Sequence, residues 1–286
     1  YLYNGSGVAT ADFNNDGLLD LFFVGAMSSN KLYINSGGLK FKDITAAAGV
    51  AGPNILKTGV AVHDVNEDGY MDIYVCHSGL AAKNTRTNAL YINNQDGTFT
   101  EEAVDRGLDD QSNTNHAVFF DYDNDNDLDL YLLNHPTDFK LINNLSLRQL
   151  EDGTIIRRRT QGDPAEVDRL YENIGKGKFK EVSEAAGINQ KAYGLSVTPM
   201  DINEDGYMDL YVGNDFIEPD FLYVNQGDGT FKNEIDAYFP HTSNNTMGAD
   251  AGDVNNDGRL DFMSLDMLPE THYRQKTLMT SMRYDR

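Results

Sequence analysis

Carboxylate and amide side chains recur in this chain in a nine-residue pattern that could hold a metal ion. The pattern reads Asp-x-Asn-x-Asp-Gly-x-x-Asp, and the third of its five copies has Asp123 at position 3 and Asn126 at position 6. We call these segments the acidic loops and number the residues of each from 1 to 9. The acidic loops cover residues 12–20, 64–72, 121–129, 201–209 and 253–261. Five copies with the same internal spacing predict a repeated binding unit rather than an accident of composition.

Side chains at positions 1, 3, 5 and 9, together with the backbone carbonyl of position 7, would surround a hard cation with oxygen atoms. Glycine at position 6 permits the sharp turn that such a loop needs. All-oxygen ligation without His or Cys favours Ca²⁺ over zinc or copper, and a wrapped loop with little water favours Ca²⁺ over Mg²⁺. We therefore expect about five Ca²⁺ ions. The expected ligands are Asp12, Asn14, Asp16, Leu18, Asp20, Asp64, Asn66, Asp68, Tyr70, Asp72, Asp121, Asp123, Asp125, Asp127, Asp129, Asp201, Asn203, Asp205, Tyr207, Asp209, Asp253, Asn255, Asp257, Arg259 and Asp261.

The role expected of this calcium is structural. The pattern begins like an EF-hand loop but ends with Asp at position 9 instead of Glu at position 12, and apolar runs flank it. This arrangement predicts a strand–loop–strand hairpin. The alternative is a set of metal-free turns, because Asp, Asn and Gly also form these; five copies with Asp at positions 1, 5 and 9 favour calcium. Asn126 is expected to adopt a left-handed conformation with some strain.

A second motif keeps a fixed distance from the acidic loops. Leu-Tyr-x-Asn is followed by Phe eight residues after the Tyr, and the next acidic loop begins 22 or 23 residues after that Phe. The Tyr and Phe pairs are Tyr33 and Phe41, Tyr91 and Phe99, Tyr171 and Phe179, and Tyr223 and Phe231. The apolar runs that follow the acidic loops are typical of strands buried on both faces. Four short strands in each repeat predict the blade of a β-propeller.

The chain is therefore expected to be all-β, with residues 1–286 forming a single β-propeller region of about five blades. The expected blades are 6–50, 58–108, 114–188, 194–239 and an incomplete one at 246–286. Residues 139–168 interrupt the third blade as a surface insertion. We favour a solvated loop for this insertion over a partner-binding segment.

Composition excludes several classes of partner. The net charge of −22 would repel the phosphates of nucleic acids and of anionic membranes. One cysteine cannot form an internal disulfide, and no apolar run is long enough for a transmembrane helix. The first residues lack the pattern of a signal peptide, which is therefore not expected in this sequence. Five bound Ca²⁺ ions would offset ten of the excess negative charges.

The acidic loops, with Gly-Val-Ala segments such as 7–9 and 59–61 before them, resemble FG-GAP/VCBS repeats, the blades of integrin α-subunit-like propellers. The Leu-Tyr-x-Asn element and residues 265–270 resemble the ASPIC/UnbV-type subset, many of whose members are secreted or surface proteins of bacteria. The resemblance implies a seven-bladed, calcium-binding propeller used for adhesion, ligand binding or scaffolding.

The sequence departs from that family pattern at its end. It carries four complete blades and the first half of a fifth, and no Leu-Tyr-x-Asn element follows Asp261. Either the chain is part of a longer polypeptide, or five blades close with an irregular last one; we favour the first alternative. Other domains or subunits would then complete the propeller.

No catalytic or cofactor-binding residue is assigned, and whether the protein is an enzyme stays open, with a non-enzyme favoured. His63 and His116 are expected to pack near strand ends, and Cys76 to be a buried apolar side chain. The leading expectation is an extracellular or cell-surface module that binds a protein or glycan. The alternatives are a propeller-type polysaccharide lyase or hydrolase with structural calcium, using the 139–168 insertion, and a module of a large surface complex or filament.

Overall fold

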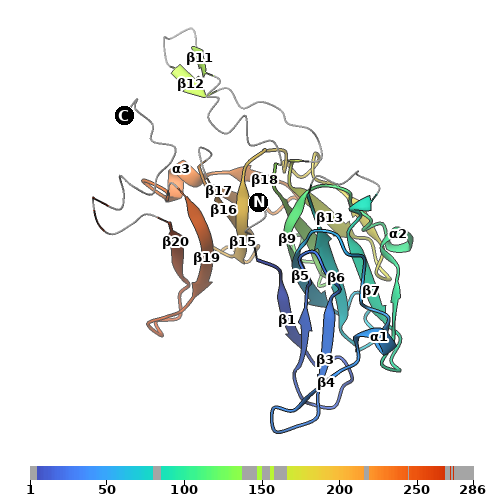
Figure 1. Ribbon diagram of the computed structural model, residues 1–286. Helices are drawn as coiled ribbons and strands as arrows, with labels where there is room; N and C mark the ends of the chain where they lie inside the picture. The colour runs from blue at the N-terminus through green and yellow to red at the C-terminus, as the bar shows by residue number, and fades with distance from the viewer. Residues whose placement is uncertain are drawn as a thin grey trace.

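The computed structural model confirms the all-β prediction (Figure 1). It describes residues 5–79, 85–136, 147–149, 155–157, 166–215, 219–243, 245–267, 271 and 273. Within these residues the chain forms four four-stranded and two two-stranded antiparallel sheets. Each four-stranded sheet pairs its strands in chain order, which is the arrangement of a propeller blade.

The first blade contains β1 (Val8–Ala11), β2 (Asp20–Phe23), β3 (Lys31–Asn35) and β4 (Phe41–Asp43). The second contains β5 (Lys57–His63), β6 (Asp72–His77), β7 (Ala89–Asn93) and β8 (Phe99–Glu101). The third contains β9 (Thr114–Phe120), β10 (Asp129–Asn134), β13 (Arg169–Asn173) and β14 (Phe179–Glu181). The fourth contains β15 (Gly194–Met200), β16 (Asp209–Asn214), β17 (Phe221–Asn225) and β18 (Phe231–Asn233).

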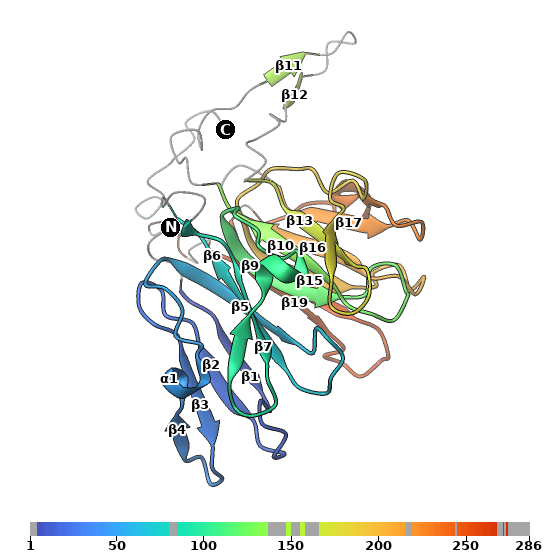
Figure 2. The same cartoon turned by 90° about the vertical axis from the view of Figure 1, so that its right-hand side faces the viewer.

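The fifth repeat is a two-stranded sheet, β19 (Thr246–Gly252) and β20 (Asp261–Asp266). Among the residues that the structure describes, no third strand pairs with β20. Within the predicted insertion, β11 (Leu147–Gln149) and β12 (Ile155–Arg157) pair as a hairpin that stands apart from the blades in Figures 1 and 2. The other residues of 139–165 lie outside the described ones.

Single-turn helices follow the fourth strands of three blades. These helices are α1 (Thr45–Ala48), α2 (Ala103–Arg106) and α3 (Ile235–Tyr238). Gly49 and Gly107 end the first two in the left-handed conformation, with φ of 79° and 80°. In the third blade, the equivalent residues 183–187 form turns instead of a helix.

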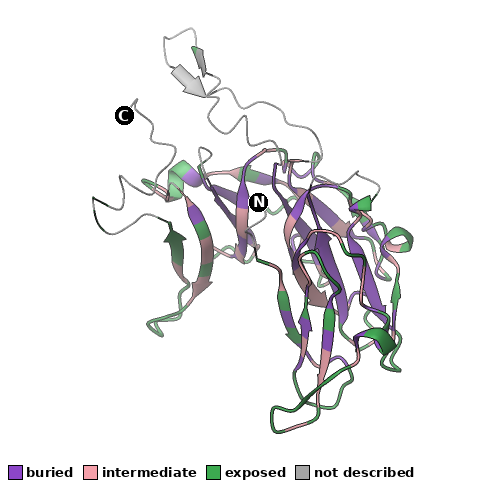
Figure 3. Cartoon of the chain, in the orientation of Figure 1, coloured by how far each residue is buried: buried purple, intermediate pink, exposed green. Residues whose placement is uncertain are grey.

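The hydrophobic core lies between successive blades. In β6, Ile73 and Val75 pack toward the first blade, while Tyr74 and Cys76 pack toward the third. The second strands β6, β10 and β16 are therefore buried along their whole length, as their continuous apolar runs predict (Figure 3). In the outermost repeats, β2 and β20 keep partly exposed or exposed residues such as Phe23. One shared cluster fills each gap between neighbouring blades, four clusters in all among the described residues.

The first strands of the blades lie next to one another along the inner side of the assembly. Contacts join β1 to β5, β5 to β9, β9 to β15 and β15 to β19. The blades thus form an open fan, with β1–β4 at one end and β19–β20 at the other (Figures 1 and 2). No described helix is both long and apolar enough to cross a lipid bilayer.

Candidate metal centres

Each acidic loop joins the first two strands of its blade. Position 1 directly follows the first strand, and position 9 is the first residue of the second strand. In the first blade, Ala11 pairs with Asp20 across the mouth of the loop, and the same pair of positions closes the other four loops. Each loop is therefore held at both ends by a strand pair, which is the predicted strand–loop–strand hairpin.

Two positions of every acidic loop adopt a left-handed backbone. At position 6, φ is 84° to 89° for the four glycines and 73° for Asn126, so the expectation for this residue is confirmed. At position 4 the residue is never glycine, yet φ lies between 56° and 63° in all five loops. The sequence did not reveal this second turn. The position 4 residues are Asn15, Glu67, Asn124, Glu204 and Asn256.

Backbone N–H groups hold the side chains at positions 1 and 5 of every loop, and also those at position 3 of the first four loops. In the first loop, the Asp12 carboxylate accepts hydrogen bonds from the N–H groups of Asp16 (3.1 Å) and Gly17 (2.7 Å). Asn14 Oδ1 also accepts from Asp16 N–H. Oδ1 at position 5 accepts from the N–H of position 7 in all five loops. The position 7 residues are Leu18, Tyr70, Asp127, Tyr207 and Arg259.

The aspartate at position 9 bridges its loop to the third strand of the blade. Asp72 Oδ2 accepts from the N–H of Val65 at 2.9 Å, and its Oδ1 accepts from the N–H of Asn93 at 2.8 Å. The same two bonds are made by Asp20, Asp129 and Asp209 in the other complete blades. The N–H donor on the third strand is always the Asn of Leu-Tyr-x-Asn. This function of the second motif was not predicted.

Burial sets the acidity of these aspartates. Asp72 and Asp129 are each 1% exposed, and burial raises the pKa of both to about 7, against the lowering effect of the backbone hydrogen bonds. Burial also raises the pKa of Asp20 and Asp209. The carboxylates at positions 1 and 5 of the same loops add a further upward shift of the pKa. Each such site therefore favours either a bound proton or a bound cation.

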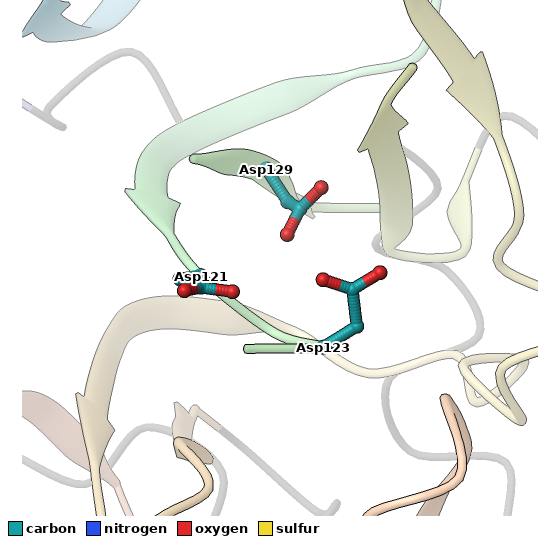
Figure 4. A group of neighbouring side chains, drawn as sticks. All are labelled: Asp121, Asp123 and Asp129. Atoms are coloured by element: carbon teal, nitrogen blue, oxygen red, sulfur yellow. The ribbon is translucent and has the colours of Figure 1, made fainter. Parts of the chain in front are cut away.

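The third acidic loop is the most strongly acidic site. One carboxylate oxygen each of Asp121, Asp123 and Asp129 lies within 4.8 Å of the other two (Figure 4). Asp127 Oδ1 is buried without a hydrogen-bond partner, and burial, followed by the charges of Asp125 and Asp123, raises the pKa of this carboxyl to about 6. Converging oxygens and an unpartnered oxygen fit a hard cation such as Ca²⁺.

Other candidate groups pack into the core. The His63 ring lies 5.2 Å from the Phe119 ring of the next blade, in keeping with packing near a strand end. Cys76 is fully buried in the cluster between the second and third blades, as expected, and burial raises the pKa of its thiol.

Comparison with known protein families gives an FG-GAP-like repeat match at residues 3–75, 80–132, 156–212 and 209–264. The chain belongs to the FG-GAP-like repeat family. This membership confirms the expected repeat type and agrees with the propeller blades described above.

Among relatives of this FG-GAP-like chain is cartilage acidic protein 1 of Mus musculus, 26% identical over 246 residues, covering 83% of the chain and 33% of the relative. Cartilage acidic protein 1 of Homo sapiens is 25% identical over 245 residues, covering 83% of the chain and 32% of the relative. The chain spans about a third of the length of these relatives. The crystal structure of the V. cholerae biofilm matrix protein Bap1 covers 79% of this chain and 27% of its own at 13% identity, with a TM-score of 0.34 that is too low to bear on the fold.

Proposed function

We propose that this FG-GAP-like chain is a calcium-stabilised propeller module that acts outside the cell or at its surface. The observation that carries the proposal is the convergence of Asp121, Asp123 and Asp129 in the third acidic loop, which also holds the unpartnered Asp127 oxygen. Like charges this close repel one another unless protons or a cation neutralise them. The oxygen-only donor set supports Ca²⁺ as that cation.

Bound calcium would supply positive charge between the first two strands of each blade. The aspartates at position 9 would turn toward the ion while keeping their backbone N–H partners, because a carboxylate oxygen has more than one lone pair. Calcium would thereby fasten the acidic loop to the third strand through the Asn of Leu-Tyr-x-Asn. We expect affinities on the order of 10⁻⁴–10⁻³ M, which suit extracellular calcium.

Ligand binding or scaffolding is the activity that we propose for the module. The relationship to proteins named for cartilage supports an extracellular setting. An array of matrix proteins and glycans, probed with the purified protein in calcium and in EDTA, tests this part of the proposal. Calcium-dependent capture of one ligand class supports it, and turnover of a polysaccharide would instead favour the enzyme alternative.

Thermal unfolding tests the calcium part of the proposal. We expect the Tm to rise in millimolar CaCl₂ and to fall in EDTA, because the ion binds the folded state alone. Asp123→Asn should reduce this difference, whereas Glu184→Gln removes an exposed charge outside the acidic loops and should leave it intact. Equal melting curves in calcium and EDTA would contradict a structural role for the ion.

A further inference from the structure

The first two acidic loops are joined directly by two side-chain amides. Asn15, at position 4 of the first loop, donates through Nδ2 to the carbonyl of Gly69 in the second loop at 2.9 Å. Asn93, on the third strand of the second blade, donates through Nδ2 to the carbonyl of Phe13 in the first loop at 2.9 Å. Each loop thus supplies one carbonyl acceptor for an amide that belongs to the other blade.

The third and fourth acidic loops are joined by the same two bonds. Asn124 Nδ2 donates to the carbonyl of Gly206 at 3.0 Å, and Asn225 Nδ2 donates to the carbonyl of Tyr122 at 2.7 Å. The loop positions involved are 4, 6 and 2, as in the first pair. Asn124 lies 109 residues after Asn15, so the repetition of both bonds indicates a recurrent contact between loops rather than a local accident.

Between the second and third loops, neither bond recurs among the residues that the structure describes. Position 4 is Glu67, whose carboxylate cannot donate a hydrogen bond when it is ionised. The side-chain amide of Asn173 bonds to the carbonyl of Leu128 in its own blade. The Arg106 side chain crosses the gap between these blades instead and donates to the carbonyls of Lys176 and Gly177.

The fourth and fifth loops meet only through a weak ion pair in the described part of the chain. Glu204 Oε1 lies 3.8 Å from Arg259 Nε, and both side chains are more than two-thirds exposed. An exposed ion pair of this kind contributes little. The loops are therefore grouped as first with second and third with fourth.

A continuous hydrogen-bonded path links the two position 9 aspartates of a pair. The N–H of Phe13 donates to Asp20, its carbonyl accepts from the side chain of Asn93, and the N–H of Asn93 donates to Asp72. Tyr122, through its N–H and its carbonyl, and Asn225 form the same path from Asp129 to Asp209. Fixing one loop thus fixes a residue whose N–H and carbonyl connect the last aspartates of the two loops.

We infer that the acidic loops bind cations as two cooperative pairs, the first with the second and the third with the fourth. This inference rests on the proposed calcium binding. An ion that orders one loop also fixes the carbonyls to which amides of the partner blade donate. The second ion therefore binds a loop that is already partly ordered. The fifth loop, which has no such link among the described residues, binds independently.

Hydrogen exchange of the five loop peptides, followed against free calcium, measures each site separately. In the parent protein, loops 1 and 2 should become protected at a common midpoint. Asp16→Ala removes a ligand of the first loop. The calcium concentration at which the second loop is half-protected should then rise about five-fold or more. The midpoints of the third and fourth loops should not change. Asp125→Ala should act in the same way on the fourth loop and leave the second unchanged.

A link variant separates coupling from loss of a ligand. Asn15→Gly keeps the left-handed backbone at position 4 and removes only the amide that reaches Gly69. In this variant the first two loops should still become protected by calcium, but at different calcium concentrations. Asn256→Gly makes the same change in the fifth loop, where φ is 60°, and should leave every other midpoint unchanged.

The outcomes distinguish this inference from the proposed function. Calcium-dependent protection of all loops, with an unchanged second-loop midpoint in Asp16→Ala, would overturn the pairing and leave calcium binding in place. Equal shifts of every loop in Asp16→Ala would also overturn it, because they would indicate global stabilisation. Absence of calcium-dependent protection in every loop would contradict the proposed function itself, and the pairing with it.

Discussion

The N–H of Asn93 donates a hydrogen bond of 2.8 Å to Oδ1 of Asp72, so the third strand of the second blade reaches the last residue of its acidic loop. The other three complete blades make the equivalent bond. The fifth repeat has no third strand among the described residues, and there Asp261 accepts from the N–H of Val254. This difference provides a test within one molecule.

Replacing Asp72 should cost far more stability than replacing Asp261. Asp72→Ala leaves two buried N–H groups without an acceptor and should lower the free energy of unfolding by about 3 kcal/mol. Asp261→Ala affects one exposed N–H and should cost less than about 1 kcal/mol. Urea unfolding in EDTA makes the comparison without any contribution from metal binding. Equal losses in the two variants would show that the bond to the third strand does not stabilise the loop.

The left-handed turn at position 6 should make Gly69 sensitive to a side chain. Gly69 has φ of 89° and open space around the site of a Cβ, so Gly69→Ala meets backbone strain alone, about 1–2 kcal/mol. Gly248→Ala is the matched control, since Gly248 also has open space but no left-handed φ. Gly69→Asn should recover part of the loss, because Asn126 occupies the same position in the third loop. Thermal unfolding in EDTA ranks the three variants, and a Gly248→Ala loss as large as that of Gly69→Ala would contradict this account.

Asp168 should make stability depend on pH. It is 3% exposed and accepts hydrogen bonds from Tyr131 Oη (2.7 Å) and the N–H of Asn134 (2.8 Å), and burial raises its pKa to about 7. Because the folded pKa lies above the unfolded value, its contribution is fully present below pH 3.8 and is lost as pH rises through about 7. Between pH 5 and pH 8, Asp168→Asn should therefore gain stability relative to the parent, on the order of 2 kcal/mol.

The second blade shows why Asp168→Asn should fold. There the equivalent residue is Asn88, whose Oδ1 accepts from the N–H of His77 and whose Nδ2 donates to Tyr74 Oη at 3.0 Å. An asparagine therefore satisfies the same two neighbours without a charge. Urea unfolding at a series of pH values gives the measurement. A difference between variant and parent that is constant with pH would contradict a raised pKa at this site.

Cys76 should report on opening between the second and third blades. It is the only thiol of the chain, it is fully buried, and burial raises its pKa, so the reactive thiolate is scarce in the folded state. We expect a thiol reagent to label it slowly in calcium and faster in EDTA, where the acidic loops no longer hold the strands together. Rapid labelling in both conditions would contradict the buried placement.

The fold and the placement of the acidic loops were largely predictable because they depend on local patterns. The acidic loops, the continuous apolar runs after them and the constant distance from Tyr91 to Phe99 and its equivalents all lie within short stretches of sequence. Aspartate at positions 1 and 9 marks the two ends of the loop, and the strand pairs confirm this placement. Asn126 could also be placed in a left-handed turn from its residue type alone.

Contacts between strands and between blades could not be read in this way. Asp20 and Asn35 are 15 residues apart, but the equivalent Asp129 and Asn173 are 44 apart, so no fixed spacing marks their bond. The links from Asn15 and Asn124 reach across 54 and 82 residues. In the sequence, these links are visible only as the alternation of Asn and Glu at position 4. The arrangement of the blades is needed to see that Asn at this position reaches the next loop.

The sharing of each core cluster by two blades has a consequence for how such chains change in evolution. A blade buries one face of its strands against the preceding blade and the other face against the following one. Duplication or loss of one whole repeat therefore creates a junction of the same kind as the old ones, and the apolar residues need not change. Insertions that respect this rule fall in the connections between strands, as at β11 and β12. Lineages of this architecture can thus lengthen by copying a unit, whereas a break inside a blade would expose two apolar faces at once.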